Sequence, residues 1–183
     1  MSVTRCLRLR YLLHLSKPAS DRTVYRAVHE QKPRRILELG MGAAERAVRT
    51  IEVAAHHARA EEIHYVGVDL FESRSAASGP GVSLKTAYRL LRSTGAAIRL
   101  LPGDPLTVLS RFANELGRFD LVVIAAGLSG QSLGQAWYFV PRILHGASHV
   151  LLQETRGGAA EFREVPVREV EARVQACQRR RVA

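Results

Sequence analysis

The stretch Arg34-Arg35-Ile36-Leu37-Glu38-Leu39-Gly40-Met41-Gly42-Ala43-Ala44-Glu45 decides the fold of this chain of 183 residues. A short apolar run ends in a carboxylate and a Gly-x-Gly turn, and apolar residues then recur at helical spacing as far as Ala58. The pattern predicts a strand, a tight turn and a helix. Because glycine adopts backbone conformations closed to other residues, and the first N–H groups of a helix lack partners, such a turn is suited to hold a ligand.

The residues of this turn disfavour one common class of cofactor, the dinucleotides. A dinucleotide fingerprint, G-x-G-x-x-G/A, would require glycine or alanine where this chain has Glu45. A carboxylate at the helix mouth repels a diphosphate, so the sequence disfavours a nicotinamide dinucleotide. A purely structural strand-to-helix turn stays open as a further interpretation, because a Gly-x-Gly turn alone is not specific.

Strand and helix patterns alternate along the rest of the chain. Further strands are predicted at 63–70, 97–101, 119–126 and 148–154, and amphipathic helices lie between them. Near-continuous apolar strands separated by helices predict an α/β fold, with a three-layer, doubly wound, mainly parallel sheet in the order 3-2-1-4-5. Trp137 and Phe139 are expected in the core, and Pro141 is expected to bend its helix.

Carboxylates follow the first three predicted strands. Glu38, Asp69 and Asp104 each stand at or just beyond the carboxyl end of a strand. In doubly wound sheets these ends meet at one rim, where ligands bind. Asp69 comes 27 residues after Gly42, where a carboxylate can accept both hydroxyls of a ribose. Capping of the following segments by Asp69 and Asp104 stays open as the alternative.

The ordered set resembles the class I S-adenosylmethionine-dependent methyltransferases. Glu38-x-Gly40-x-Gly42-x-Ala44 is similar to their first motif, with Ala44 where the family often has glycine. Asp69 matches the acid of the second motif and Gly103-Asp104 the third, while 119–123 resembles the start of the fourth. The resemblance covers roughly residues 20 to 155. It implies a Rossmann-like methyltransferase fold, with S-adenosylmethionine as cofactor and S-adenosylhomocysteine as product.

The resemblance also implies a set of site residues. Those expected to bind the cofactor are Glu38, Gly40, Met41, Gly42, Asp69, Leu70, Phe71, Gly103, Asp104 and Ala125. The acceptor side is expected to include Ser129, Gln131 and Ser132. No catalytic base stands out, and Glu154, at the end of the fifth strand, is the one candidate. No metal is expected, because Ala125 and its neighbours provide no acid after the fourth strand, where metal-dependent relatives place one.

The chain is expected to form a single methyltransferase-like domain. Residues 1–33 form an N-terminal helical extension, 34–155 the cofactor-binding core, and 156–183 a short tail of strand and helix, so the family's hairpin of strands 6 and 7 is expected to be incomplete. Met1 to Leu15 is expected to be an amphipathic packing helix. An incomplete sheet edge invites dimerisation or coverage by the terminal helix.

Charge is concentrated at the two ends of the chain. Residues 1–35 carry nine basic and two acidic groups, residues 36–155 eleven of each, and residues 156–183 seven and four, which gives +7, 0 and +3. No apolar run approaches the roughly 18 residues that span a bilayer, and Cys6 and Cys177 form no metal-binding or disulfide pattern. A cytoplasmic protein without membrane contact is expected.

The functions left open follow from these features. The first is metal-independent O- or N-methylation of an unidentified small molecule. The alternative is a non-catalytic protein of the same fold whose basic ends contact a partner. Nucleic acid is a less favoured acceptor or partner, and binding to it would weaken steeply with salt.

Overall fold

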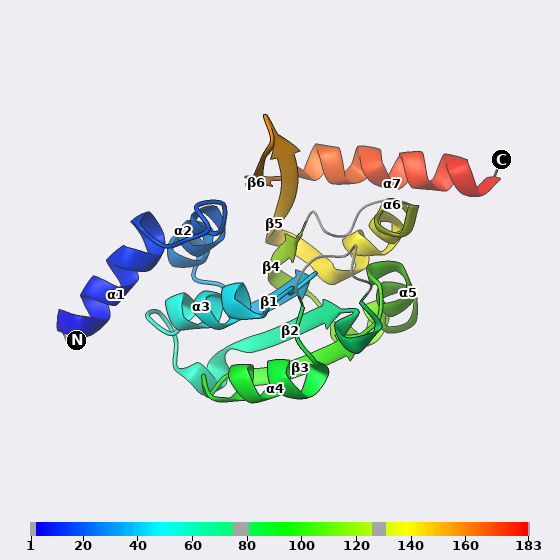
Figure 1. The fold of residues 1–183 in the computed structure, drawn as a ribbon. Coiled ribbons are helices and arrows are strands. Elements are labelled where there is room, and N and C mark those ends of the chain that lie inside the picture. The colour runs from blue at the N-terminus through cyan, green and yellow to red at the C-terminus, as the bar shows by residue number, and fades with distance from the viewer. Residues whose placement is uncertain (1–2, 75–80, 126–130, 183) are drawn as a thin grey trace.

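The computed structural model describes residues 3–74, 81–125 and 131–182. One mixed sheet of six strands, in the order β3-β2-β1-β4-β5-β6, lies at its centre (Figure 1). The strands are β1 (Arg35–Leu39), β2 (His64–Asp69), β3 (Ala97–Pro102), β4 (Phe119–Ile124), β5 (Leu144–Arg156) and β6 (Ala159–Glu164). The first five run parallel and β6 pairs antiparallel with β5. The predicted fold class and strand order are therefore confirmed.

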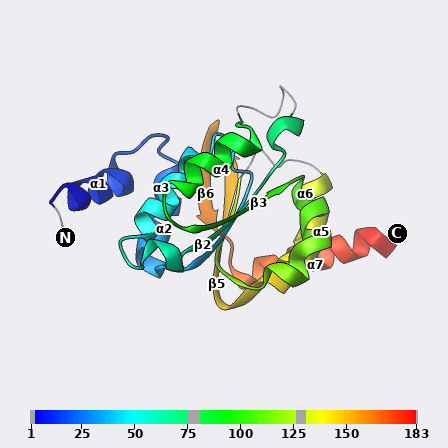
Figure 2. The same ribbon diagram turned by 90° about the horizontal axis from the view of Figure 1, so that it is seen from below.

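Helices cover both faces of the sheet (Figure 2). The α-helices are α1 (Val3–His14), α2 (Asp21–Gln31), α3 (Glu45–Ala54), α4 (Leu84–Arg92), α5 (Pro105–Leu116), α6 (Gln131–Ala136) and α7 (Val167–Val182). Short 3₁₀ segments are η1 (Ala60–Glu62), η2 (Phe71–Ser73) and η4 (Trp137–Ile143). Helices α1 to α4 pack on one face, and α5, α6, η4 and α7 pack on the other. No helix in these described ranges is long and apolar enough to cross a membrane.

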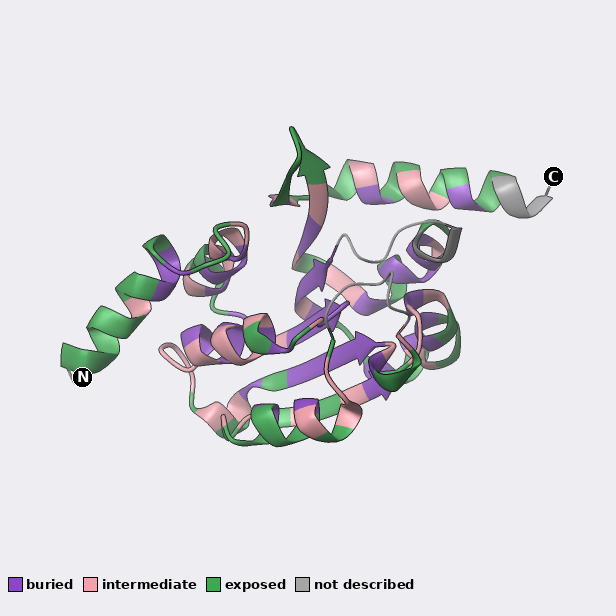
Figure 3. Ribbon diagram, viewed as in Figure 1, coloured by how far each residue is buried: buried purple, intermediate pink, exposed green. Residues whose placement is uncertain are grey.

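The strands divide their side chains between two cores because successive residues point to opposite faces. On β1, Ile36 belongs to the core beneath α2 and α3, whereas Leu37 and Leu39 belong to the core beneath α5 and η4. The buried strands stand out at the centre of Figure 3. Glu38 lies two residues after Ile36 and therefore on the same face of β1, so its carboxylate is buried among apolar side chains.

The N-terminal helix packs less fully than its sequence suggested. Leu12 and Leu13 are buried, but Val3, Leu7 and Leu15 are 75%, 62% and 66% exposed. The last turn of α1 and the partly buried Leu9 reach the core formed with α2, and Arg8 pairs with Glu52 of α3 at 2.8 Å, while the start of the helix extends away from the body (Figure 1). The apolar contacts of α1 with the rest of the protein are therefore concentrated in its second half.

The fifth strand and the segment before it also differ from the prediction. β5 is longer than expected, at 13 residues, and irregular pairing with β4 lies between Phe119 and Leu121. The helix with Pro141 changes at Trp137 from α to 3₁₀, which accommodates a proline that cannot continue an α-helix. Trp137 and Phe139 are buried, as predicted.

Candidate cofactor site at the strand tips

The glycine turn has the backbone geometry that its sequence requires. Gly40 and Gly42 have φ angles of 86° and 60°. Ala44 also lies in the left-handed region, at 63°, and caps α3 at the position where the resembling family often has glycine. A left-handed alanine costs about 1 kcal/mol relative to an ordinary helical conformation. The chain tolerates this strain because the Ala44 methyl is fully buried in the core.

Hydrogen bonds join the tips of neighbouring strands around this turn. Asp69 Oδ2 accepts from the Gly42 N–H at 2.8 Å, across 27 residues of sequence. The Gly40 N–H donates to Val68 O at 2.8 Å, and the Gly103 N–H donates to Asp69 O at 2.9 Å. The carboxyl ends of β1, β2 and β3 are thus held in one rim.

A cavity of about 520 Å³ lies along this rim. Its lining residues are Pro18, Asp21, Gly40, Met41, Gly42, Ala43, Glu45, Arg46, Asp69, Leu70, Arg74, Ala125 and Gln153. Six of the residues expected from the sequence are among them: Gly40, Met41, Gly42, Asp69, Leu70 and Ala125. The volume is in the range of small-molecule sites, which span about 300–1,000 Å³.

The other expected cofactor residues lie elsewhere. Glu38 is 1% exposed and lies beneath the turn, where Tyr65 Oη donates to its Oε2 at 2.6 Å. Phe71 is buried in the core with a φ of 46°. Asp104 caps α5, since its Oδ1 accepts from the Leu106 N–H at 3.0 Å, and Gly103 precedes it. These three side chains are therefore held by the protein itself.

The expected acceptor-side and catalytic residues have different settings. Ser129 lies outside the described residues, and Gln131 and Ser132 open α6. Glu154 points into an ion network in which Arg163 donates to it at 2.7 and 2.9 Å. This pairing lowers the pKa of Glu154. Glu154 is absent from the cavity lining, so the geometry gives it no access to a ligand held there.

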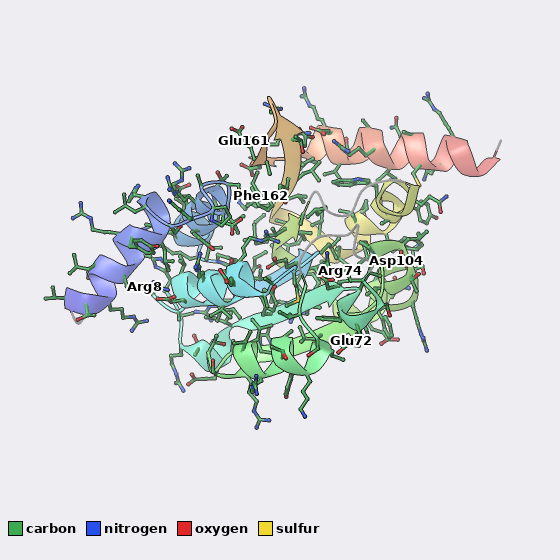
Figure 4. All side chains as sticks on the ribbon, viewed as in Figure 1. Arg8, Glu72, Arg74, Asp104, Glu161 and Phe162 are labelled. Atoms are coloured by element: carbon green, nitrogen blue, oxygen red, sulfur yellow. The ribbon has the colours of Figure 1, made fainter. Side chains whose placement is uncertain are left out.

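Besides Glu45, three charged residues that line the cavity are not among the site residues expected from the sequence. Arg46, in the first turn of α3, bonds Glu38 Oε1 at 2.7 Å and donates to Gly40 O at 2.9 Å. Arg74 pairs with Asp69 Oδ1 (Figure 4 labels Arg74). Asp21 opens α2 and is 4% exposed. The available signal for Arg46 was an arginine in the first turn of the helix that follows the Glu38 strand, whereas nothing in the local sequence marks Asp21 or Arg74 as site residues.

The extra strand β6 contributes to this site. Phe162, labelled in Figure 4, is 5% exposed and its ring lies 5.2 Å from the Arg46 guanidinium carbon. A guanidinium at this distance from an aromatic centre gains a cation–π attraction. The β6 strand therefore supports the Arg46 side chain through Phe162. In the part of the chain that the structure describes, no group of three or more His, Cys, Asp or Glu side chains is suited to hold a metal.

Solved structures share this architecture, although no family model and no curated protein matches the chain. The O-methyltransferase TomG of Streptomyces achromogenes, solved with S-adenosylmethionine, is 13% identical, with a TM-score of 0.57 over 98% of this chain and 78% of its own. The fold is that of the class I S-adenosylmethionine-dependent methyltransferases. An O-methyltransferase of Bacillus cereus with S-adenosylhomocysteine is 14% identical, with a TM-score of 0.55 over 98% and 78% of the chains.

The same fold also occurs with another reported activity. A precorrin-8w decarboxylase of Methanobacterium thermoautotrophicum is 14% identical, with a TM-score of 0.51 over 90% of this chain and 73% of its own. Fold alone does not define the reaction. The reaction therefore depends on the residues of the site.

Proposed function

We propose that this protein is an S-adenosylmethionine-dependent methyltransferase that acts on a small molecule at oxygen or nitrogen. The observation that carries the proposal is the bond from the Gly42 N–H to Asp69 Oδ2 at 2.8 Å, inside a cavity lined by the glycine turn. It fixes a buried carboxylate beside a backbone that a ligand can approach closely. Such a carboxylate is suited to accept the two hydroxyls of a ribose.

The residues around this pair fit the remaining parts of the cofactor. Leu70 and Met41 give the cavity apolar surface for the adenosine and the methionine chain. Asp104, next to the rim, is proposed to bind the adenine end of the cofactor in addition to capping its helix. Ala125, just after β4, lines the cavity and keeps its cofactor-binding role as a proposal, and Gln153 of β5, which lines the same cavity, is proposed for the acceptor side.

The proposed chemistry demands little from the protein beyond positioning. S-adenosylmethionine supplies a methyl group already activated by a sulfonium. Holding donor and acceptor in line converts a bimolecular step into an effectively unimolecular one and supplies much of the acceleration. A base is needed only where the acceptor is protonated. Because Glu154 is held by Arg163, we propose no protein base for this step.

A second candidate is a partner-binding protein of the same fold. The specific observation in its favour is that Arg74 already pairs with Asp69 Oδ1, so a ribose must share or displace this partner. The terminal excess of positive charge, +7 in residues 1–35, would then serve the partner surface. This candidate predicts no binding of S-adenosylhomocysteine.

The test of the proposed function is transfer of label. The protein is incubated with S-adenosylmethionine tritiated at the methyl group and a small-molecule extract, and radioactivity below about 1 kDa is followed together with S-adenosylhomocysteine release. We expect labelled small molecules with the wild type and none with Asp69→Ala. Wild-type protein that binds the cofactor but transfers no label to small molecules, and labels added RNA or protein, would overturn the acceptor class.

A further inference from the structure

A buried cluster of charges lies beside the glycine turn, and the inference drawn from it rests on the proposed function. Asp21, Glu38 and Arg46 have side chains that are 6%, 1% and 12% exposed. Arg46 bonds Glu38 Oε1 at 2.7 Å, and its Nη1 lies 3.6 Å from Asp21 Oδ1. Two carboxylates therefore share one guanidinium, and the cluster carries one negative charge in excess.

The two carboxylates are not equally satisfied. Glu38 is bonded at both oxygens, by Arg46 and by the Tyr65 hydroxyl. Asp21 Oδ1 is buried and accepts no hydrogen bond from any described residue. A buried polar atom without a partner costs about 1–3 kcal/mol. Burial accordingly raises the pKa of Asp21, although Arg46 acts in the opposite direction.

The other charges near Asp21 do not supply the missing cation. Arg49 donates to Lys17 O at 2.7 Å and pairs with Glu45 at 3.4 Å. Glu45 is 71% exposed at its side chain, so that pair neutralises itself at the surface. Counting Glu45 and Arg49 with the buried cluster leaves the excess at one negative charge.

Asp21 lines the same cavity as Asp69 and the glycines of the turn. With the ribose on Asp69, the groups of S-adenosylmethionine beyond the nucleoside are the sulfonium and the amino-acid tail. A sulfonium has no N–H, whereas an ammonium has three donors and a full positive charge. We infer that Asp21 receives the α-ammonium of the cofactor's methionine tail, since the other carboxylate of the cluster, Glu38, is buried and already bonded at both oxygens.

The test compares two ligands that differ only in the ammonium. Binding of S-adenosylhomocysteine and of its desamino analogue, which keeps the nucleoside and the carboxylate, is measured by calorimetry on wild type, Asp21→Asn and Glu30→Gln. Glu30 is exposed on the same helix and its substitution makes the same charge change. Because hydrogen bonds to charged groups are strong, we expect Asp21→Asn to weaken S-adenosylhomocysteine binding by about 10-fold or more. The desamino analogue is expected to bind wild type and Asp21→Asn alike, and Glu30→Gln is expected to bind S-adenosylhomocysteine as wild type does.

The outcomes separate this inference from the proposed function. If Asp21→Asn weakens both ligands equally, Asp21 supports the site without touching the ammonium, and the inference alone is overturned. Wild type that binds both ligands with equal affinity overturns it without recourse to a variant. If wild type binds neither ligand, the proposed function fails and the inference fails with it.

Discussion

Replacing Tyr65 with phenylalanine tests the buried acid beneath the turn. Tyr65 is fully buried, and its hydroxyl donates to Glu38 Oε2 at 2.6 Å. The substitution keeps the ring and removes only the donor. A hydrogen bond to a charged group contributes about 1.5–3 kcal/mol, so we expect the free energy of unfolding to fall by about 2 kcal/mol.

Urea unfolding measures this change in free energy. In thermal unfolding, a loss of about 2 kcal/mol should lower the Tm of a chain of this size by roughly 4–8 °C. Tyr88→Phe is the matched control, because Tyr88 is 44% exposed on α4. In a double-mutant cycle with Glu38→Gln, we expect a coupling of about 1–2 kcal/mol between positions 38 and 65. A Tyr65→Phe protein as stable as Tyr88→Phe, with no coupling to Glu38→Gln, would refute the account of the buried acid.

Three further substitutions test other parts of the structure. Hydrogen bonds from Arg163 and then Arg173 lower the pKa of Glu169 to about 2. The ionised carboxylate therefore stabilises the fold above its ordinary pKa of 4.5, and this stabilisation is lost as the pH falls towards 2. After allowance for solvent screening, Glu169→Gln should lower the free energy of unfolding by about 1 kcal/mol at pH 7 and leave it unchanged at pH 2, as measured by urea unfolding. Gly67→Ala places a methyl 2.1 Å from Met41 Sδ, and overpacking of this kind should cost about 1–3 kcal/mol in the same assay. Asp104→Ala removes the cap of α5 and should lower stability by about 1 kcal/mol, whereas an unchanged Tm would contradict the capping geometry.

The sheet could be predicted because its signals are local. The run from Arg35 to Leu39 is apolar and short, the Gly-x-Gly turn follows it, and the same alternation recurs for the next four strands. Ser83 likewise caps α4 as its position predicts, with its hydroxyl oxygen accepting from the Thr86 N–H at 3.1 Å. Each of these features depends on neighbours within a few residues.

The site was only partly predictable because its remaining contacts join distant segments. The Asp120 carboxylate is an example: its Oδ2 accepts from the Arg34 and Arg35 N–H groups at 2.8 Å, across more than 80 residues. A ring nitrogen of His57 lies 2.9 Å from one of His29, which is 28 residues away in the sequence. Asp21 joins Arg46 in the same way. Pairings of this kind depend on how helices pack on the sheet, which periodicity does not encode.

The central claim is that the glycine turn and Asp69 bind the cofactor, and calorimetric titration with S-adenosylhomocysteine tests it most directly. The wild-type protein and the Asp69→Asn variant are both titrated, and NAD⁺ serves as a second ligand. The account predicts saturable binding of one S-adenosylhomocysteine per chain, a loss of about 10-fold or more in affinity for Asp69→Asn because a charged acceptor is removed, and no heat with NAD⁺. Absence of binding to the wild type, or equal binding by the variant, would contradict it.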